Sequence, residues 1–494
     1  MTTSTPWASR RRAQGAPSAL WLLAAALSLL AACGDTARTG PGRPDSGGAD
    51  EGPLPPLSSS GRWFTDAAGR TVLFHGFNEV AKSPPFYPAA FGFGEDDAAF
   101  LAREGFNMIR LGVDFRGLMP APGEIDEDYI GHLRETAHVL ARHRIFVLLD
   151  FHQDGFAPLF NGNGLPDWMA ITDGLPNPPE AVFPLYYVQN SAMQRAFEHF
   201  WANSPGPGGV GLQDYFVQGV EQVVAAFADD PWVIGYELMN EPWPGADWGS
   251  CVEPGGCAAL EQRLLVPFQR RVGGAARAIA TDRFVFVEPF VLFNFGRAPT
   301  TLPGRGPGLA LSFHSYAIDE AGEEAVLRLG ASAAERDGAP VLVTEFGATT
   351  DARKLDRLAG QMERNLLPWL DWSYDESIIA DHDLPASPGN LRRPAAFDAL
   401  VRPYPVAITG TPTALAFDLE SKTLDFAYDA WSRDPGDLTT VVHVPSRHYP
   451  AGYAVAVDGA GVTSAPCAEH LTLRNTPGAR RVRLRLTPSP AGCP

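Results

Sequence analysis

Eight short apolar runs alternate with helix-like segments through most of the chain. The intervening segments 129–142 and 214–228 carry apolar residues at helical spacing. Strands that alternate with helices favour a parallel sheet, and eight strands are the number that closes a (β/α)8 barrel. We therefore predict an α/β fold, a TIM barrel over residues 59–402. The expected strands are 72–76, 108–111, 145–150, 233–239, 284–288, 309–314, 341–345 and 366–372.

The pattern changes after about residue 403. Short alternating runs at 414–418, 439–444, 453–457 and 482–486 are separated by Gly, Pro, Asp and Ser. Alternation with period two and frequent turn residues is typical of antiparallel strands. We therefore predict a C-terminal β-sandwich domain over residues 403–494.

The N-terminus has the order of an export signal. Arg10, Arg11 and Arg12 precede an apolar run at 19–32, which ends in small residues followed by Cys33. This pattern resembles a bacterial lipoprotein signal (residues 1–33), which implies acylation of Cys33 and a membrane-anchored, exported protein. Plain secretion is the alternative, and the run is shorter than the roughly 20 residues of a spanning helix. Residues 34–58 are rich in Gly, Pro, Ser and Asp and indicate a flexible tether.

Charge and cysteine content restrict the partners. A formal net charge of −18 over 494 residues argues against nucleic acid, because phosphate binding needs clustered basic residues. In an exported protein, four further cysteines suggest two disulfides. Three pairings are possible, and we favour the near neighbours. No zinc-type spacing is present, and we expect no metal, no cofactor and a monomeric chain. The four cysteines are Cys251, Cys257, Cys467 and Cys493.

Two glutamates end predicted strands four and seven. Glu241 follows Asn240, and Glu345 lies in a Thr-Glu-Phe-Gly phrase. The C-terminal ends of barrel strands are where such folds build active sites. A retaining glycosidase needs one protonated carboxylic acid and one ionised carboxylate about 5–5.5 Å apart. We assign Glu241 as the acid/base and Glu345 as the nucleophile, with Asn240 placed to bind a sugar hydroxyl.

Several phrases in order resemble the cellulase-like family 5 glycoside hydrolases. They are Asn107-Met-Ile-Arg110-Leu, Asp150-Phe-His152-Gln-Asp154, Asn240-Glu241-Pro242, His314-Ser-Tyr316 and Thr344-Glu345-Phe346-Gly347. The resemblance implies that Arg110 keeps the nucleophile ionised, and that the sugar is held by His152, His314 and Tyr316. It also implies that Trp372 is the platform under that sugar.

Finer features are similar to endoglycoceramidases and their relatives, from about residue 60 to the C-terminus. Lys82, Asp154 and Trp168 match sugar-contacting residues of that group. The implied reaction is hydrolysis of the bond between the glycan and the ceramide of a glycosphingolipid. Such a glycolipid substrate needs an apolar groove beside the sugar pocket. Candidate aromatic segments are 86–88, 91–93, 159–160, 183–187 and 290–295.

Other functions remain open at this point. An endo-β-glucanase, a β-mannanase or a steryl-glucoside glucosidase would use the same catalytic pair with a different leaving-group side. A surface carbohydrate-binding protein without catalysis is a further alternative, although both glutamates are present. The sequence contains no phosphate-binding Gly-rich loop and no Gly-x-Ser-x-Gly nucleophile elbow.

Overall fold

The computed structural model describes residues 54–493, apart from 182, 253–255, 297–299, 301, 305, 433–435 and 490. The expected signal, Cys33 and most of the tether lie outside the described residues. Within the described part of the chain, no helix has both the length and the apolarity that a membrane span requires.

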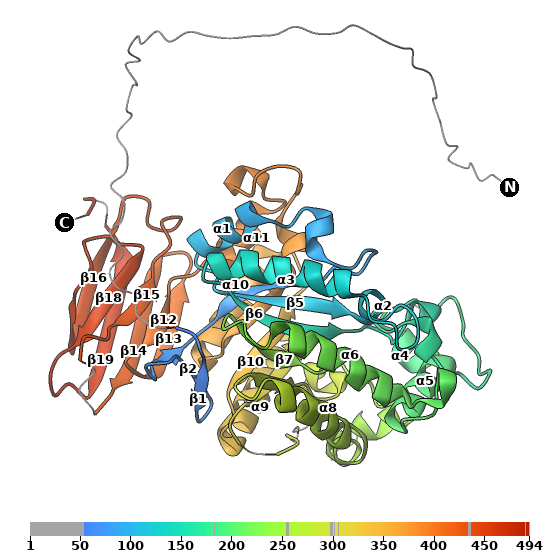
Figure 1. The fold of residues 1–494 in the computed structure, drawn as a ribbon. Coiled ribbons are helices and arrows are strands. Elements are labelled where there is room, and N and C mark those ends of the chain that lie inside the picture. The colour runs from blue at the N-terminus through green and yellow to red at the C-terminus, as the bar shows by residue number, and fades with distance from the viewer. Residues whose placement is uncertain are drawn as a thin grey trace, which may run out of the picture. The chain divides into compact units, whose positions relative to one another are not determined.

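The core of the fold is a closed barrel of eight parallel strands, as predicted (Figure 1). The strands follow one another in chain order around the barrel, and the last pairs with the first. They are β4 (His75–Glu79), β5 (Met108–Asp114), β6 (Phe146–His152), β7 (Val233–Glu237), β8 (Phe284–Val287), β9 (Leu309–Ser315), β10 (Val341–Gly347) and β11 (Trp369–Trp372).

The first barrel strand differs from its prediction at 72–76. Residues Thr71–Val72 form β3, which pairs antiparallel with a strand after the barrel, and β4 begins only at His75. The apolar run crosses from one sheet into another. Hydrophobicity alone does not reveal such a crossing, because both sheets bury their strands.

Helices cover the outside of the barrel. Helix α3 illustrates why these segments are helical: Asp126 caps its first turn by accepting from the Tyr129 amide, and its apolar face is buried. The helices are α1 (Glu95–Arg103), α2 (Phe115–Leu118), α3 (Glu127–Arg142), α4 (Tyr186–Gln189), α5 (Ser191–Trp201), α6 (Leu212–Phe227), α7 (Ala258–Leu260), α8 (Val266–Ile279), α9 (Glu320–Asp337), α10 (Ala352–Asn365) and α11 (Pro394–Leu400).

The N-terminal end of the barrel is closed by β2 (Trp63–Thr65). Phe64 lies within the barrel core, with its ring centroid 5.4 Å from that of Phe74 and 5.2 Å from that of Phe284. Its ring also stacks on Phe286 at 5.9 Å. This packing fills the N-terminal end of the barrel interior with aromatic side chains.

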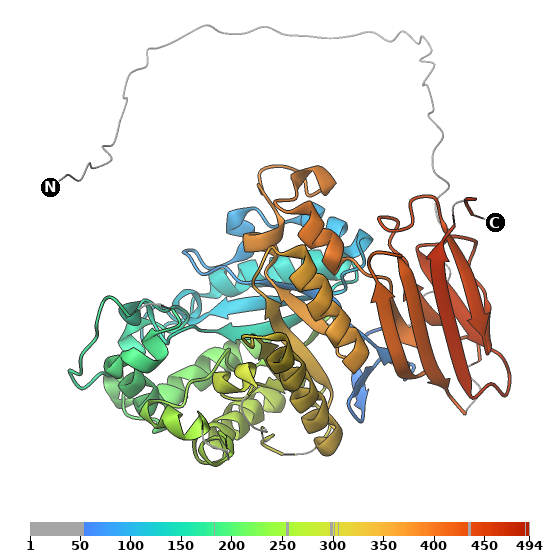
Figure 2. The ribbon, with the colours of Figure 1, turned by 180° about the vertical axis from the view of Figure 1, so that it is seen from behind.

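Two antiparallel sheets form the C-terminal sandwich, and their strands from residues 404–488 are orange and red in Figure 2. The seven-stranded sheet also takes in β1 (Ser58–Ser60), β2 and β3, which we had expected to belong to the barrel segment. The remaining strands of that sheet are β12 (Tyr404–Ile408), β15 (Thr440–His443), β18 (His470–Asn475) and β17 (Ala460–Val462). The second sheet contains β13 (Gly410–Asp418), β14 (Thr423–Ala430), β19 (Arg481–Pro488) and β16 (Tyr453–Asp458).

Buried ionic contacts join the sandwich to the barrel helices. Arg402, which precedes β12, donates from Nη2 to Glu363 of α10 at 3.0 Å and to the Phe417 carbonyl at 2.8 Å. Disulfides join Cys251 to Cys257 and Cys467 to Cys493, the near-neighbour pairing.

Candidate active site

The two predicted catalytic glutamates meet at the C-terminal end of the barrel. Oxygen atoms of Glu241 and Glu345 and a ring nitrogen of His314 all lie within 4.8 Å of one another. Glu345 lies within β10, whereas β7 ends at Glu237 and Glu241 follows four residues later. The backbone of Glu241 has a φ of +42°, a left-handed conformation that is uncommon for a residue with a side chain. The chain thus turns sharply to place this carboxyl over the barrel.

A buried arginine supports Glu345. Nη1 of Arg110 donates to Oε1 of Glu345 at 2.6 Å, and Tyr316 donates its hydroxyl to Oε2 at 3.0 Å. The same guanidinium donates to Asn240 at 2.7 Å and contacts Asp150 at 3.0 Å and Glu237 at 2.5 Å. Charge-assisted hydrogen bonds of this kind favour an ionised carboxylate.

The other carboxyl, Glu241, has two hydrogen-bond partners at one oxygen. Asn294 donates from Nδ2 to Oε1 at 2.8 Å, and Nδ1 of His314 lies 2.8 Å from the same Oε1. The Glu241 backbone amide donates to Oε2 of Glu288 at 2.8 Å. If Nδ1 of His314 carries the ring hydrogen, Oε1 accepts from both groups and a proton on this carboxyl lies on Oε2.

Burial and charge give the two glutamates different environments. Burial raises the pKa of Glu241 to about 8, Asp154 adds to the rise, and the charges of His152 and Lys82 oppose it. Burial also raises the pKa of Glu345, and there His314 and Arg110 counteract the rise. The carboxyl without a direct cationic hydrogen bond therefore holds its proton at neutral pH.

The two histidines of the site are shifted in opposite directions. Burial lowers the pKa of His314 to about 4, so its ring is neutral. Burial also disfavours charged His152, but the carboxylates of Asp150 and Asp154 outweigh that effect and raise its pKa to about 9. His152 bonds Asp150 at 2.7 Å and lies 3.3 Å from Asp154.

A polar chain continues from His152 to the cavity wall. Lys82 donates to Asp154 at 2.8 Å, and its ammonium lies 4.2 Å from the ring centroid of Trp372. Asn163 also donates to Asp154, at 3.0 Å. These side chains line the same cavity as Glu241 and Glu345, and they combine hydrogen-bonding groups with one aromatic face, as a sugar ring requires.

A cavity of about 550 Å³ lies over the two glutamates. Its polar wall contains Lys82, Asp154, Asn161, Asn163 and the two catalytic candidates, with Trp372 beside them. Most of its apolar wall comes from two segments that we had predicted from their aromatic content, 183–187 and 290–295, and Val188 and Trp243 lie outside both. That wall is formed by Phe183, Pro184, Tyr186, Tyr187, Val188, Trp243, Val291, Leu292 and Phe295.

Some predicted residues lie elsewhere. The Trp168 indole is directed away from the cavity lining: it donates to the Met119 carbonyl at 3.4 Å and packs edge-on against Tyr215 of α6. The aromatic segments 86–88, 91–93 and 159–160 are also absent from the described residues that line the cavity, and Phe93 and Phe160 are buried in the core. The short 3₁₀ helix around Trp168 turns its side chain toward α6 instead.

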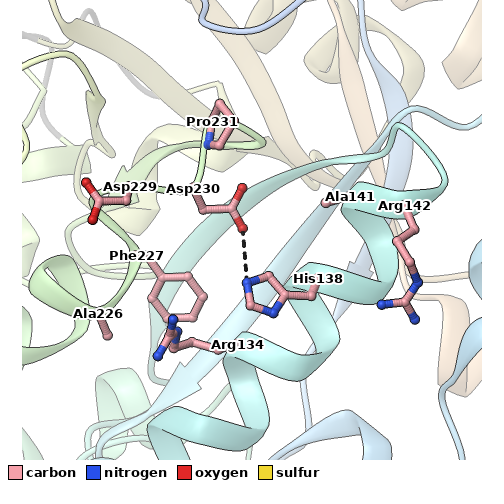
Figure 3. A pocket seen from close by; sticks show the side chains of 9 residues that line it. All are labelled: Arg134, His138, Ala141, Arg142, Ala226, Phe227, Asp229, Asp230 and Pro231. Carbon is pink, nitrogen blue, oxygen red and sulfur yellow. Dashed lines mark ion pairs between the residues drawn. The ribbon is translucent and has the colours of Figure 1, made fainter.

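A second hollow, of about 630 Å³, lies between α3 and the loop before β7 (Figure 3). His138 faces Asp230 there at 4.0 Å, with Arg134 beside it. Asp230 precedes the start of β7, so this hollow lies toward the N-terminal ends of the strands. In such barrels the active site is built at the opposite, C-terminal face, and residues of the N-terminal face serve stability.

Sequence reasoning missed several side chains that complete the site. Glu237 accepts from Arg110, Asn294 donates to Glu241, and Glu288 accepts the Glu241 amide. Glu237 and Glu288 end apolar runs just as the catalytic pair does, which is a usable signal. Asn294 carried no signal because it lies in a short 3₁₀ helix, Val291–Phe295, whose position depends on the fold.

Comparisons with known proteins identify the family. The cellulase model of glycosyl hydrolase family 5 matches residues 65–377, and the model of the family 5 C-terminal domain matches residues 402–485. The chain belongs to glycoside hydrolase family 5. As a member of that family, it is a glycosidase.

Two curated relatives cover at least 80% of the chain. Endoglycoceramidase I of Rhodococcus hoagii is 33% identical over 448 residues, which cover 85% of this chain and 86% of the relative. Endoglycoceramidase of Hydra vulgaris is 28% identical, over 80% and 81% of the two chains. The structure of endo-glycoceramidase II from Rhodococcus sp. in complex with ganglioside GM3 superposes with a TM-score of 0.71 at 26% identity, covering 86% of this chain and 99% of that one.

Proposed function

We propose that this family 5 enzyme is a retaining β-glycosidase that hydrolyses the bond between the glycan and the ceramide of glycosphingolipids. The observation that carries the proposal is the contact of the apolar wall with Glu241, through the 3₁₀ helix Val291–Phe295 that lines the cavity. An acid catalyst delivers its proton to the leaving group, so the wall next to the acid is where the aglycone lies.

The connection between the acid and the apolar wall is direct. The Val291 amide donates to the carbonyl of Pro242, the residue after Glu241, at 3.1 Å. The same 3₁₀ helix supplies Asn294 to the acid and Leu292 and Phe295 to the cavity. Phe183 is 64% exposed and Phe295 is 43% exposed. A lipid chain would cover these surfaces, and each fully buried side chain would contribute about 1.5–3 kcal/mol.

We place the glycan on the ring of Trp372, which lies close to the nucleophile strand. The Ala348 amide, three residues after Glu345, donates to the Trp372 carbonyl at 3.1 Å, which ties the aromatic platform to the nucleophile strand. Lys82 and Asp154 lie beside that platform. Charged hydrogen-bonding groups around an aromatic ring suit a sugar, whose edge is polar and whose face is apolar.

In the first step, a carboxylate oxygen of Glu345 attacks the anomeric carbon. The bond from that carbon to the ceramide oxygen breaks, and Glu241 transfers its Oε2 proton to that oxygen. The products are a glycosyl ester of Glu345 and a free ceramide hydroxyl. In the second step, ionised Glu241 takes a proton from water, the water oxygen attacks the anomeric carbon, and the ester bond breaks.

The short separation of the two carboxyls supports retention. Oxygens of Glu241 and Glu345 lie within 4.8 Å of each other. Inverting enzymes hold their carboxyls roughly 6.5–9.5 Å apart to admit a water molecule between acid and sugar. The relatives named endoglycoceramidase, and the solved complex of one of them with ganglioside GM3, support the choice of glycosphingolipid as substrate.

The test is incubation of the enzyme, without residues 1–47, with a glycosphingolipid panel and a β-glucan in detergent. Mass spectrometry then detects free ceramide and intact glycan. Release of ceramide that Glu345→Gln abolishes is the expected result. Oligosaccharides from the glucan, without ceramide from any lipid, would contradict the proposed substrate and assign the enzyme to polysaccharide breakdown.

We also propose that the enzyme is exported and anchored through an acylated Cys33. The support is the order of basic residues, apolar run and cysteine at 10–33. An anchor of this kind would hold the enzyme close to lipid-embedded substrate.

A further inference from the structure

We propose that Glu288 is a positioning residue that, as a neutral carboxylic acid, selects the tautomer of His314 and thereby places the reactive proton of Glu241 on Oε2. The inference rests on the proposed role of Glu241 as acid and adds a third carboxyl to the mechanism. Glu288 touches neither the cavity nor the reacting atoms, so it acts only through its neighbours.

Glu288 follows β8 directly and is buried. Its two carboxyl oxygens face two different parts of the acid's surroundings. Oε2 accepts the backbone amide of Glu241 at 2.8 Å, and Oε1 lies 3.5 Å from Nε2 of His314. Its backbone carbonyl accepts from Gln269 of α8 at 2.9 Å, which anchors the strand end.

Two buried polar atoms face each other in this contact. Among the described residues, neither Oε1 of Glu288 nor Nε2 of His314 has a hydrogen-bond partner. Buried polar atoms are nearly always paired, and hydrogen bonds in active sites often shorten when substrate binds. A hydrogen bond between these two atoms satisfies both, provided that one of them carries the proton.

Which of these two atoms carries the proton depends on the contact that Nδ1 of His314 makes with Glu241. Nδ1 of His314 lies 2.8 Å from Oε1 of Glu241, which also accepts from Asn294. When Nδ1 carries the hydrogen of a neutral ring, Nε2 is a bare acceptor. Only a protonated Glu288 can then donate to Nε2.

Surrounding charges are consistent with a neutral Glu288. Burial raises its pKa well above the ordinary value, and the carboxyls of Glu237 and Glu241 add to the rise. Arg110 opposes the rise from across the barrel. Arg110 itself forms ion pairs with Glu345, Glu237 and Asp150.

The consequence for Glu241 is geometric. Two N–H donors converge on Oε1, so the proton of the acid is kept on Oε2. If Nε2 of His314 carried the hydrogen instead, Nδ1 would become an acceptor and would draw the Glu241 proton to Oε1. The amide contact with Oε2 of Glu288 meanwhile holds the left-handed backbone at Glu241.

The matched variants are E288Q and E288A. A glutamine amide can accept the Glu241 N–H with its oxygen and donate to His314 with its nitrogen, so it imitates the neutral acid and not the carboxylate. We expect E288Q to keep kcat/KM within a few-fold and to retain the wild-type pH profile. We expect E288A to lose about 10-fold or more on phenyl β-lactoside, as a misdirected acid catalyst would.

Leaving-group dependence separates positioning from general damage. The dinitrophenolate group of 2,4-dinitrophenyl β-lactoside leaves without protonation, so E288A should cleave this substrate almost as well as the wild type does. E241Q, assayed in parallel, should show the same contrast between the two substrates. An equal loss on both substrates in E288A would indicate a structural role and would overturn the proposal. Equal impairment of folded E288Q and E288A would overturn it too, because an ionised carboxylate would then be required.

A readout without turnover keeps the inference testable by itself. Nitrogen-15 NMR of the His314 ring should report hydrogen on Nδ1 in the wild type and in E288Q. Hydrogen on Nε2 in either protein would overturn the proposal, even if E288A does not fold. A wild-type enzyme without glycosidase activity or an E241Q variant without leaving-group dependence would instead contradict the proposed function, and the tautomer measurement would still decide the role of Glu288.

Discussion

Nη1 of Arg110 lies 2.6 Å from Oε1 of Glu345, and both residues are buried. The guanidinium also contacts Glu237 and Asp150, so one cation compensates three carboxylates that are distant in sequence. This arrangement ties the charge of the proposed nucleophile to the stability of the barrel.

Replacing Arg110 should therefore reduce both the catalytic rate and the stability of the protein. A lysine cannot reach all three carboxylates with one ammonium group, so we expect Arg110→Lys to lower kcat about 100-fold and to lower Tm. Removing the cation in Arg110→Met should cost about 3–5 kcal/mol, because buried carboxylates remain unpaired. Steady-state kinetics and thermal unfolding measure the two effects. Arg485→Lys, at an exposed ion pair with Asp425, is the control and should leave both unchanged.

Azide should distinguish the roles of the two glutamates. Glu241→Ala and Glu345→Ala should each reduce turnover by a factor of about 10³ or more without unfolding the protein. Azide should then give a glycosyl azide of retained configuration with Glu241→Ala, because the covalent intermediate still forms. It should give an inverted azide with Glu345→Ala, because azide replaces the nucleophile. Proton NMR of the products shows the configuration. An inverted azide from Glu241→Ala and a retained azide from Glu345→Ala would exchange the two assignments.

The pH profile should follow Glu241. This acid must be protonated to act, and its pKa is raised to about 8. We expect kcat/KM to be retained up to that value and to be lost as the pH rises through it. The limb on the acid side should reflect Glu345, whose pKa is raised above its ordinary value by burial. A basic limb that Glu241→Gln leaves unchanged, measured on an activated aryl glycoside, would contradict this assignment.

The same shift makes a prediction about stability. Folded Glu241 holds its proton more tightly than the unfolded chain does, so stability falls as the pH rises from the ordinary value of 4.5 toward about 8. Glu241→Gln removes this penalty. Its Tm relative to the wild type should therefore be higher at pH 8 than at pH 4, as differential scanning calorimetry would show. A Tm difference that does not change with pH would exclude a raised pKa at Glu241.

Charge on the apolar wall should impair lipid substrates selectively. In Phe295→Asp, a carboxylate would meet the proposed ceramide chain, and we expect about 10-fold less ceramide release in detergent. Cleavage of an aryl β-lactoside should change less than about 2-fold. Val462→Asp on the sandwich is matched in exposure, 42% against 43%, and should affect neither reaction. An equal loss on both substrates in Phe295→Asp would place this side chain in the sugar site instead.

Acylation of Cys33 can be tested in a bacterial host. Labelled palmitate should be incorporated into the full chain and recovered with membranes, whereas Cys33→Ser should carry no label because its thiol is missing. Label on the Cys33→Ser variant, or none on the wild type, would contradict the lipid anchor.

Much of this site could be predicted from the chain, and particular residues show why the rest could not. Glu241 and Glu345 were found because each lies in a specific phrase at the end of an apolar run. The strand expected at 72–76 was misplaced because its first residue, Val72, pairs with Ala407 of β12, more than 300 positions later. Trp168 was expected at the sugar, yet it packs against Tyr215, a choice that depends on the path of its loop.

The residues around Glu241 could not be predicted from the sequence either. A glutamate after an apolar run resembles many surface carboxylates, so Glu288 stood out only when its oxygens proved to face Glu241 and His314. Asn294 reaches the acid from a 3₁₀ helix whose position is set by packing.

The sequence by itself determined the eight-fold alternation, the appended sandwich and the residue types at the strand ends, because periodicity and local phrases are properties of neighbouring residues. The tertiary structure alone decided which carboxyl is protonated and which is paired with a cation. Protonation depends on burial and on charges such as that of Arg110, 131 positions before Glu241 (241 − 110). Only the closed barrel brings these groups within hydrogen-bonding distance of one another.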